Sequence, residues 1–392
     1  GVHYVGFLEQ VLKLAKFTHT GLLMVNPRSR DENEKEKKRF AKLGVEMSIV
    51  DKETLKERFP CISSDIGEFD NTGEREYIPR EMANETLLLT FCLFVLYAIL
   101  FFFFKKNKNK KKRILGYFEP VQALVDLQHC IRTHYASRVE LHYNTEVTEV
   151  LHHGGHVTGV TVRNRTDKQK HTIYSDTVIN CNGPWYERVV NEMLNGLDIK
   201  FTIKPVRIQV CFKDVPQLFH PDLLHKYHLR VPVPVIADTL TGIYMRPQVN
   251  SKQILFSTIK EEEERDVINP DECPVELGAD PDMRDKYLHS FYHRLSPVLD
   301  PSQPGSQKVQ SLSGMYTVNE EDAHPIIGET KLKGFWVANA FTGHGFKIAP
   351  QVGSILARNI TRTTLPDDST VDINFYSPYR SPLQLAVKNV FA

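Results

Sequence analysis

The chain has 392 residues, of which 41% are hydrophobic, so it can bury a substantial core in about two or three domains. Its 49 basic and 48 acidic residues nearly cancel. Such a balance gives no overall field that would favour nucleic acid or an anionic membrane. A specific small molecule is therefore the expected partner. The cysteines form no C-x-x-C pair, which favours reduced thiols over a disulfide framework or a zinc site.

The first part of the chain predicts short strands that alternate with charged helices. Residues 21–27 are apolar and end in a turn signal, which indicates a strand. Residues 31–43 are highly charged with apolar positions at helical spacing, and residues 53–59 repeat this pattern and stop at Pro60. Residues 1–10 show no signal-peptide or transit-peptide pattern; a part further upstream could carry one.

Residues 87–104 are the most unusual segment, because they carry no charge and are followed at once by a basic run at residues 105–113. Length and flank fit a transmembrane helix with a basic anchor. Two other interpretations stay open. The segment could be an apolar insertion buried within the protein or at an interface. It could also be foreign to the fold, which we favour because its composition is low in complexity and the flanking patterns join without it.

The middle of the chain predicts one helix and a small antiparallel meander. A helix is expected over residues 121–135, with Pro120 in its first turn. Alternating apolar and polar residues then predict strands at residues 139–143, 146–151, 157–163 and 171–180. The last of these runs into Asn182, Gly183, Pro184 and Trp185 and a following helix, which is a strand-turn-helix junction.

Strand patterns dominate the second half of the chain. Strands are expected at residues 206–212, 231–238, 242–246 and 254–259, and a charged helix at residues 282–295. This predicts a mostly antiparallel sheet with helices on one face. The chain then closes with a buried strand at 334–340, a glycine-rich turn at 342–345 and an amphipathic helix at 349–361.

The turn containing Gly343, His344 and Gly345 is the best candidate for chemistry. Two glycines between a strand and a helix N-terminus let backbone N–H groups approach an electron-rich group closely, and the helix dipole adds positive potential. Such a turn suits an anion or the edge of an isoalloxazine ring. It also occurs as a plain connector.

Four stretches, in the same order, resemble the D-amino-acid oxidase and sarcosine oxidase superfamily. Residues 334–357 resemble its terminal flavin-contacting strand-turn-helix, with G-H-G-x-K at residues 343–347. Residues 116–120, 178–185 and 322–328 resemble its G-x-x-x-P, V-I-N-A-A-G-x-W and D-G-x-P-I-I-G segments. Residues 234–247 further suggest the mitochondrial FAD-dependent oxidoreductase-domain branch.

The resemblance implies a mixed α/β fold, in which a truncated Rossmann-like FAD-binding domain accompanies an antiparallel-sheet substrate domain. The expected parts are an N-terminal remnant of mostly substrate-domain or cap elements (1–86), the apolar and basic insertion (87–113), part of the FAD-binding domain (114–200), the substrate domain (201–315), and the C-terminal part of the FAD-binding domain with a tail (316–392).

The resemblance also implies FAD-dependent oxidation of a secondary amine or amino acid, with hydride transfer to flavin N5 and an imine product. Lys347 matches the family lysine that binds the substrate carboxylate; His344, Tyr244 and Arg246 are further catalytic candidates. The expected cofactor-binding residues are Gly183, Pro184, Trp185, Val147, Gly314, Met315, Gly343, His344, Gly345, Phe346 and Lys347. Packing or surface roles stay open for Lys347, His344, Trp185, Tyr244 and Arg246. The histidines lack ligand spacing, so no metal is expected.

Two departures from the family pattern matter. No G-x-G-x-x-G follows a strand near the N-terminus, so the backbone cradle for the FAD pyrophosphate is missing from the sequence. Gly314 stands where sarcosine oxidases carry a flavin-linking cysteine, so bound FAD should be non-covalent. A non-catalytic scaffold or assembly factor, attached to a membrane through residues 87–104, is the alternative function, and an incomplete gene product is a third. A mitochondrial or other intracellular location, with or without membrane association, is expected.

Overall fold

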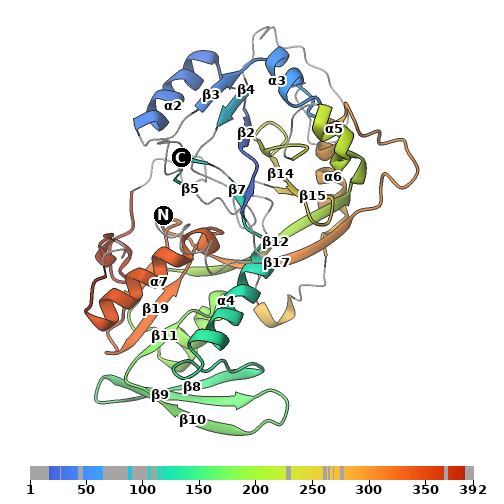
Figure 1. Ribbon diagram of the computed structural model, residues 1–392. Helices are drawn as coiled ribbons and strands as arrows, with labels where there is room; N and C mark the ends of the chain where they lie inside the picture. The colour runs from blue at the N-terminus through green and yellow to red at the C-terminus, as the bar shows by residue number, and fades with distance from the viewer. Residues whose placement is uncertain are drawn as a thin grey trace.

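The computed structural model describes residues 17–26, 28–42, 47–64, 87–90, 105–106, 113–114, 116–226, 231–258, 263, 265–267, 269–273, 278–365 and 370–384. Within these ranges the chain combines helices with antiparallel and mixed sheets, which agrees with the predicted mixed α/β class. Figure 1 shows a large sheet on one side, a group of small sheets on the other, and two long strands that connect them.

The large sheet has nine strands. Eight follow the order β16-β12-β15-β14-β13-β2-β4-β3, and β17 pairs with β12 along its length. Neighbours are antiparallel except β13 and β2, which run parallel. The strands are β2 (Leu22–Val25), β3 (Met47–Val50), β4 (Leu87–Thr90), β12 (Ile203–Asp214), β13 (Val235–Asp238), β14 (Ile243–Gln248), β15 (Gln253–Thr258), β16 (Arg265–Asp266) and β17 (Gln310–Asn319).

One face of this sheet packs against helix α6 (Pro281–Leu295). Met245 on β14 lies opposite Phe256 on β15, which in turn lies opposite Cys211 on β12, and all three belong to the core that α6 completes. Phe291 of α6 stacks on Phe256 with ring centroids 4.6 Å apart. Since side chains alternate between the faces of a strand, the neighbours of these residues point to the other face.

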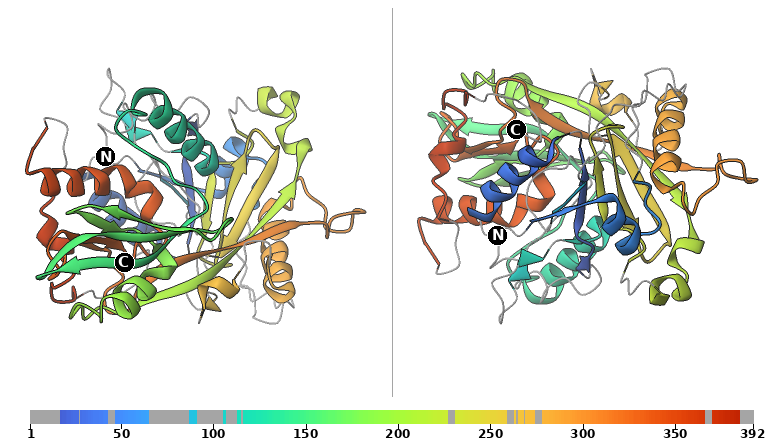
Figure 2. Two further views of the ribbon diagram at one scale, coloured as in Figure 1. Left: turned by 90° about the horizontal axis from the view of Figure 1, so that it is seen from below. Right: turned by 90° about the horizontal axis from the view of Figure 1, so that it is seen from above.

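That other face carries Tyr244 and Arg246, which follow β14 in alternation with Met245. Helix α4 (Pro120–His134) lies on this side, and both views of Figure 2 place α4 and α6 on opposite sides of the large sheet. Gly314 on β17 lies opposite Ile208 on β12. Two residues further along β12, Val210 lies opposite Ser257 on β15, and Ser257 lies opposite Tyr244 on β14. The register therefore puts Tyr244, Arg246 and Gly314 on one face.

Two three-stranded sheets and a long helix form the other part of the molecule. The first sheet has the order β11-β19-β18, with β11 parallel to β19, and the second is an antiparallel meander. The elements are β8 (Thr145–His153), β9 (His156–Asn164), β10 (Lys170–Tyr174), β11 (Val178–Asn180), β18 (Ile326–Glu329), β19 (Phe335–Asn339) and α7 (Gly345–Thr361). Helix α7 packs Val352 and Leu356 against Ile327 and Ala338 of β18 and β19.

The shorter elements complete the described chain. The N-terminal helices are amphipathic as predicted, and Asp51 caps α3 by accepting a hydrogen bond from the Thr54 backbone N–H. These elements are α2 (Arg30–Lys42), α3 (Lys52–Arg58), α5 (Pro221–Lys226), β1 (Thr18–His19), β5 (Lys105–Lys106), β6 (Arg113–Ile114), β7 (Gly116–Tyr117), the 3-10 helices η1 (Gly183–Trp185), η3 (Pro216–Phe219), η5 (Pro270–Glu272) and η7 (Ile373–Tyr376), and the π-helix η2 (Arg188–Met193).

A buried ion pair anchors the C-terminal segment beside the small sheets. Asp322 is fully buried, and its carboxylate pairs with Arg380 and accepts hydrogen bonds from the backbone N–H groups of His324 (3.0 Å) and Leu383 (2.9 Å). The Arg380 guanidinium lies 4.4 Å from the centre of the Phe201 ring. The D-A-H-P-I-I-G stretch at residues 322–328 thus begins with a carboxylate that binds the C-terminal segment at Arg380 and Leu383.

Three expectations need correction. Leu87–Thr90 forms strand β4 between β2 and β3, although a helix or a segment foreign to the fold was expected to begin there. An apolar run fits a buried strand as well as a helix, and pairing at both edges decides here. The rest of the apolar run lies outside the described residues. No helix within the described ranges is long and apolar enough to cross a membrane.

The other two corrections concern element boundaries. Residues 139–143 are not a strand, although their alternation predicts one. A strand needs a neighbour for its backbone groups, and none of the described strands pairs with this segment. Helix α7 begins at Gly345, four residues before the predicted start, because the turn leads directly into helical backbone and Pro350 is accommodated in the second turn.

Candidate functional site

The turn between β19 and α7 reverses the chain through left-handed backbone. Ala340, Thr342 and Gly343 have φ values of 60°, 44° and 70°. The Thr342 backbone N–H donates to the carbonyl of Thr317 on β17 at 2.9 Å, which fixes the turn to the large sheet. Non-glycine residues at positive φ cost free energy and cluster at ligand sites, so this turn is held by its surroundings.

Asn339 joins three segments at this point. Its Oδ1 accepts hydrogen bonds from the Thr317 hydroxyl (2.8 Å) and the Ala340 backbone N–H (2.6 Å), and its Nδ2 donates to the Gly183 carbonyl (3.1 Å). The side chain is 1% exposed. The sequence reasoning did not single out Asn339. A buried amide at the end of a hydrophobic strand, directly before a glycine turn, was the signal that could have identified it.

His344 and Lys347 lie at the start of α7 and are both largely buried. The His344 Nδ1 lies 2.6 Å from the Thr342 carbonyl, which can only accept, so this nitrogen carries the proton. Burial, and then the nearby charge of Lys347, lower the pKa of His344 to about 4. Burial lowers the pKa of Lys347 to about 7. Among the described residues no carboxylate or other hydrogen-bond partner contacts the Lys347 amine.

Two predicted cofactor-binding glycines leave room beside them. Gly183 has a φ of 54°, and no atom of the described residues lies within 4 Å of a Cβ placed on it. A Cβ on Gly314 would meet only the Ile208 side chain, at 4.0 Å. By contrast, a Cβ on Gly345 would lie 3.2 Å from the Phe341 side chain, so this glycine is needed for the close packing of the turn itself.

The remaining predicted cofactor-binding residues lie on four different elements. Trp185 ends η1 after Pro184, and its indole N–H donates to Asp271 at 2.8 Å, which also binds Arg188 at 2.6 Å. Phe346 lies in the first turn of α7. Val147 is on β8 opposite Val162, and Met315 is on β17 opposite Arg207. The hydrogen bonds of Asn339 thus bring Gly183 and the turn together, whereas no hydrogen bond among the described residues links Val147 or Met315 to the turn directly.

Tyr244 and Arg246 form a separate cluster on the large sheet. Both are 1% exposed. Arg246 pairs with Glu119 at 3.1 Å, and its guanidinium lies 4.4 Å from the centre of the Tyr117 ring. Burial raises the pKa of Tyr244. Glu119, which precedes α4, was not singled out in the sequence; it binds the Nη1 atom of Arg246, whereas the buried Arg246 Nε has no hydrogen-bond partner among the described residues.

The residues present fit one part of FAD. The glycine turn leads into the N-terminus of α7, where Lys347 lies in the first turn, and Asn339 ties Gly183 to the same turn. The positive potential at a helix N-terminus suits the electron-rich edge of an isoalloxazine ring. The pyrophosphate part is not matched, because the sequence contains no G-x-G-x-x-G. No group of three or more His, Cys, Asp or Glu side chains in the described ranges could hold a metal ion.

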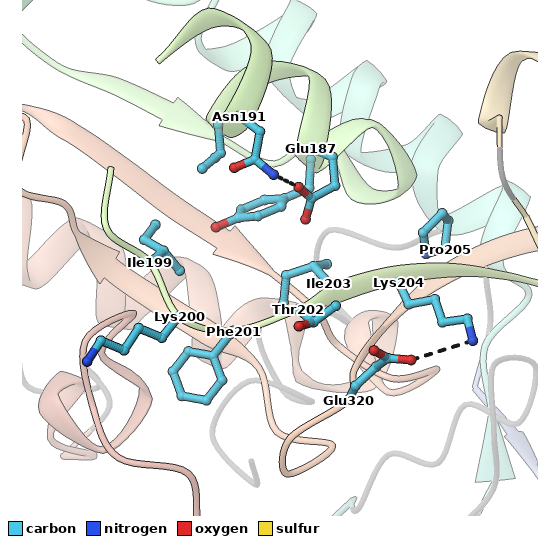
Figure 3. A pocket seen from close by; sticks show the side chains of 12 residues that line it. Glu187, Asn191, Ile199, Lys200, Phe201, Thr202, Ile203, Lys204, Pro205 and Glu320 are labelled. Carbon is cyan, nitrogen blue, oxygen red and sulfur yellow. Dashed lines mark hydrogen bonds and ion pairs between the residues drawn. The ribbon is translucent and has the colours of Figure 1, made fainter. Parts of the chain in front are cut away.

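A pocket of about 610 Å³ lies between η2 and the start of β12 (Figure 3). None of the predicted site residues lines it. Two pairs of its polar side chains interact, since Asn191 donates to Glu187 and Lys204 lies 3.5 Å from Glu320, whereas the buried Tyr186 hydroxyl has no hydrogen-bond partner among the described residues. Burial raises the pKa of Glu187. Lys200 also lines the pocket and is exposed, in contrast to Lys347.

Comparison with known proteins places this geometry in a family. The family described as FAD dependent oxidoreductase (DAO) matches residues 119–359. A Caenorhabditis elegans protein named "Putative sarcosine oxidase" is 28% identical over 192 residues, which are 47% of this chain and 44% of that protein. The match thus spans less than half of the relative's length.

Two crystal structures share the fold. That of L-proline dehydrogenase from P. horikoshii covers 97% of this chain with a TM-score of 0.62 and 17% identity, and 83% of that structure is matched. That of glycine oxidase from Geobacillus kaustophilus covers 96% of this chain with a TM-score of 0.64 and 13% identity, and 80% of it is matched.

Proposed function

Because the chain belongs to the FAD dependent oxidoreductase family, we propose that it oxidises a secondary amine or an amino acid with non-covalently bound FAD. Bound FAD would supply the acceptor for the hydride that leaves the substrate carbon. The observation that carries the proposal is Lys347, a partly buried amine that no described residue pairs with, next to a glycine turn at a helix N-terminus. The names of the relative and of the two proteins of similar structure refer to sarcosine, L-proline and glycine, and all three compounds carry a carboxylate.

The residues of the turn would share the work. The dipole of α7 and the backbone N–H groups of its first turn would hold positive potential where negative charge develops during oxidation. The His344 backbone N–H is not among them, because it donates to the Phe341 carbonyl at 2.8 Å. His344 stays neutral above pH 5, because its pKa is about 4, so it orients by hydrogen bonding and adds no charge. Lys347 in its charged form binds the substrate carboxylate and thereby selects amino acids over simple amines.

The proposal is tested by substituting Lys347. We expect Lys347→Met to weaken binding of sarcosine or proline about 10- to 100-fold, which is the loss of one hydrogen bond between charged groups. Binding of the corresponding amides and of FAD should change little. Ligand affinity is read from the flavin absorbance, and acid denaturation should release the flavin if it is non-covalent. Lys38→Met, on the exposed side of α2, is the matched control.

Unchanged affinity for the carboxylate ligands would remove Lys347 from the site and amino acids from the substrate class. A second candidate function is that of a non-catalytic scaffold which keeps the fold as an interaction platform. A folded but colourless protein that never takes up flavin, even with the cradle supplied, would support the scaffold.

A further inference from the structure

Asn180 carries a buried side-chain donor that has no partner among the described residues. The residue is 4% exposed, and its Oδ1 accepts a hydrogen bond from the Asn182 backbone N–H at 3.0 Å. Because a backbone N–H can only donate, this bond fixes which end of the Asn180 amide is the oxygen. The other end, Nδ2, is a donor that no described group accepts from. Such an unsatisfied donor lowers the stability of the empty fold.

The position of Asn180 in the sheet is one where ligands bind. Asn180 is the last residue of β11, which runs parallel to β19, and it lies opposite Val337, two residues before the end of β19 at Asn339. In open sheets of parallel strands, ligands bind outside the carboxyl ends of the strands. Two buried asparagines thus end neighbouring strands at the same edge. The Asn339 Nδ2 is satisfied by the Gly183 carbonyl, whereas the Asn180 Nδ2 is not satisfied within the described residues.

Gly183 leaves space close to this donor. It follows Asn180 by three residues, and a Cβ placed on it would meet no atom of the described residues within 4 Å. A glycine with open space beside it lets a ligand approach the backbone closely. An unsatisfied donor and an open stretch of backbone therefore occur together where β11 leads into η1. This combination fits a ligand oxygen better than it fits a plain connection between a strand and a helix.

The register of the strands indicates which part of FAD the donor would meet. Asn180 shares a face of the small sheet with Val337, which packs in one core with Val150 of β8 in the meander. Ala338, the next residue of β19, points to the opposite face and packs against α7. The isoalloxazine ring is assigned to the N-terminus of α7, so the meander side is left for the phosphate-bearing part of the dinucleotide.

We propose that Asn180 is a cofactor-binding residue, whose Nδ2 donates a hydrogen bond to a phosphate oxygen of FAD at the carboxyl end of β11. This inference rests on the proposed function, because it takes FAD as the ligand. A phosphate oxygen is charged and accepts strong hydrogen bonds. The contact would satisfy the buried donor and recover the free energy that its burial costs.

The test measures the affinity of two Asn180 variants for FAD and for ADP by titration calorimetry. Asn180→Thr keeps an oxygen that can accept from the Asn182 N–H, and Asn180→Asp keeps that oxygen but replaces the donor with a charged oxygen. We expect both variants to bind FAD and ADP about 10- to 100-fold more weakly, which is the loss of one hydrogen bond to a charged group. Asn33→Leu, at an equally buried asparagine of α2, is the control and should leave both affinities unchanged. Urea unfolding shows that each variant is folded, and Asn180→Ser takes the place of one that is not.

Unchanged affinity in Asn180→Thr would overturn the proposal, and weakening in Asn180→Asp alone would show only that an added charge repels the phosphates. Weaker binding of FAD with unchanged or absent binding of ADP would place the contact on the flavin half and overturn the phosphate assignment. These affinities do not depend on oxidation. Weaker FAD binding in a protein that oxidises no amine would refute the proposed function and keep the contact, whereas oxidation with unchanged affinity would refute the contact alone. An unsubstituted protein that binds neither FAD nor ADP would refute both.

Discussion

Lys347 should destabilise the fold at neutral pH, and Lys347→Met should therefore make the protein more stable. Burial lowers the pKa of Lys347 from its ordinary value of 10.5 to about 7. Since a pKa shift of one unit corresponds to about 1.4 kcal/mol, holding the charged amine in the fold below pH 7 costs on the order of 5 kcal/mol. Methionine has a similar length and carries no charge, so the variant avoids this cost.

The effect should depend on pH with a defined sign. Between pH 7 and 10.5 the unfolded chain keeps the Lys347 proton while the folded chain has lost it. The unfolded state thus binds more protons, and the stability of the unsubstituted protein rises with pH in this window. The advantage of Lys347→Met should accordingly be largest below pH 7 and disappear near pH 10.

Urea unfolding of both proteins at several pH values from 6 to 10 measures this difference, because all other titrating groups contribute equally to both. Lys38→Met should change the free energy of unfolding by less than about 0.5 kcal/mol at every pH. A Lys347→Met protein that is less stable at pH 6, or a difference that does not vary with pH, would show that the amine has an anionic partner in the fold. Lys347 would then be an ordinary structural residue.

Two further predictions concern the framework of the site. Asp322→Asn should lower the free energy of unfolding by about 3 to 5 kcal/mol, because it leaves Arg380 buried without its carboxylate. Burial raises the pKa of Asp322, but Arg380 and two backbone N–H groups outweigh burial and keep this pKa below its ordinary value. The stability difference between the two proteins should therefore shrink at acidic pH, where Asp322 becomes protonated. In the same urea assay, Gly314→Ala should lower the free energy of unfolding by less than about 1 kcal/mol. Gly334→Ala should lower it by more than about 3 kcal/mol, because Gly334 has a φ of 77° and an added Cβ would lie only 2.1 Å from the Asp176 carbonyl oxygen.

The sequence alone predicted the limits of an element wherever a periodic pattern is bounded by a proline, a glycine or a capping residue. Helices α2, α4 and α6 begin and end within one or two residues of their predicted limits, because charged faces and an initial proline or cap are local signals. The glycine turn at 343–345 was found for the same reason. Leu87–Thr90 was misassigned because an apolar run does not encode its partners, and only pairing with β2 and β3 makes it a strand.

Contacts between distant segments could not be read from the sequence. Glu119 neutralises Arg246 across 127 positions of the chain, and this pairing changes Arg246 from a free substrate-binding charge into part of a buried ion pair. Asn339 likewise gains its role from Gly183 at the start of η1 and from Thr317 on β17. Each of these roles depends on the register of strands that only the folded chain establishes.

The contrast between Arg246 and Lys347 is the strongest physical reason to place the substrate carboxylate at α7. Both side chains are at least partly shielded from solvent, and a buried cation is costly unless it is paired, loses its charge or binds an anionic ligand. Arg246 has Glu119 and the Tyr117 ring, whereas Lys347 has neither an anion nor a ring among the described residues. An anionic ligand would restore the charged form of Lys347 and recover the free energy that its burial costs, so the same feature that weakens the empty fold would strengthen carboxylate binding.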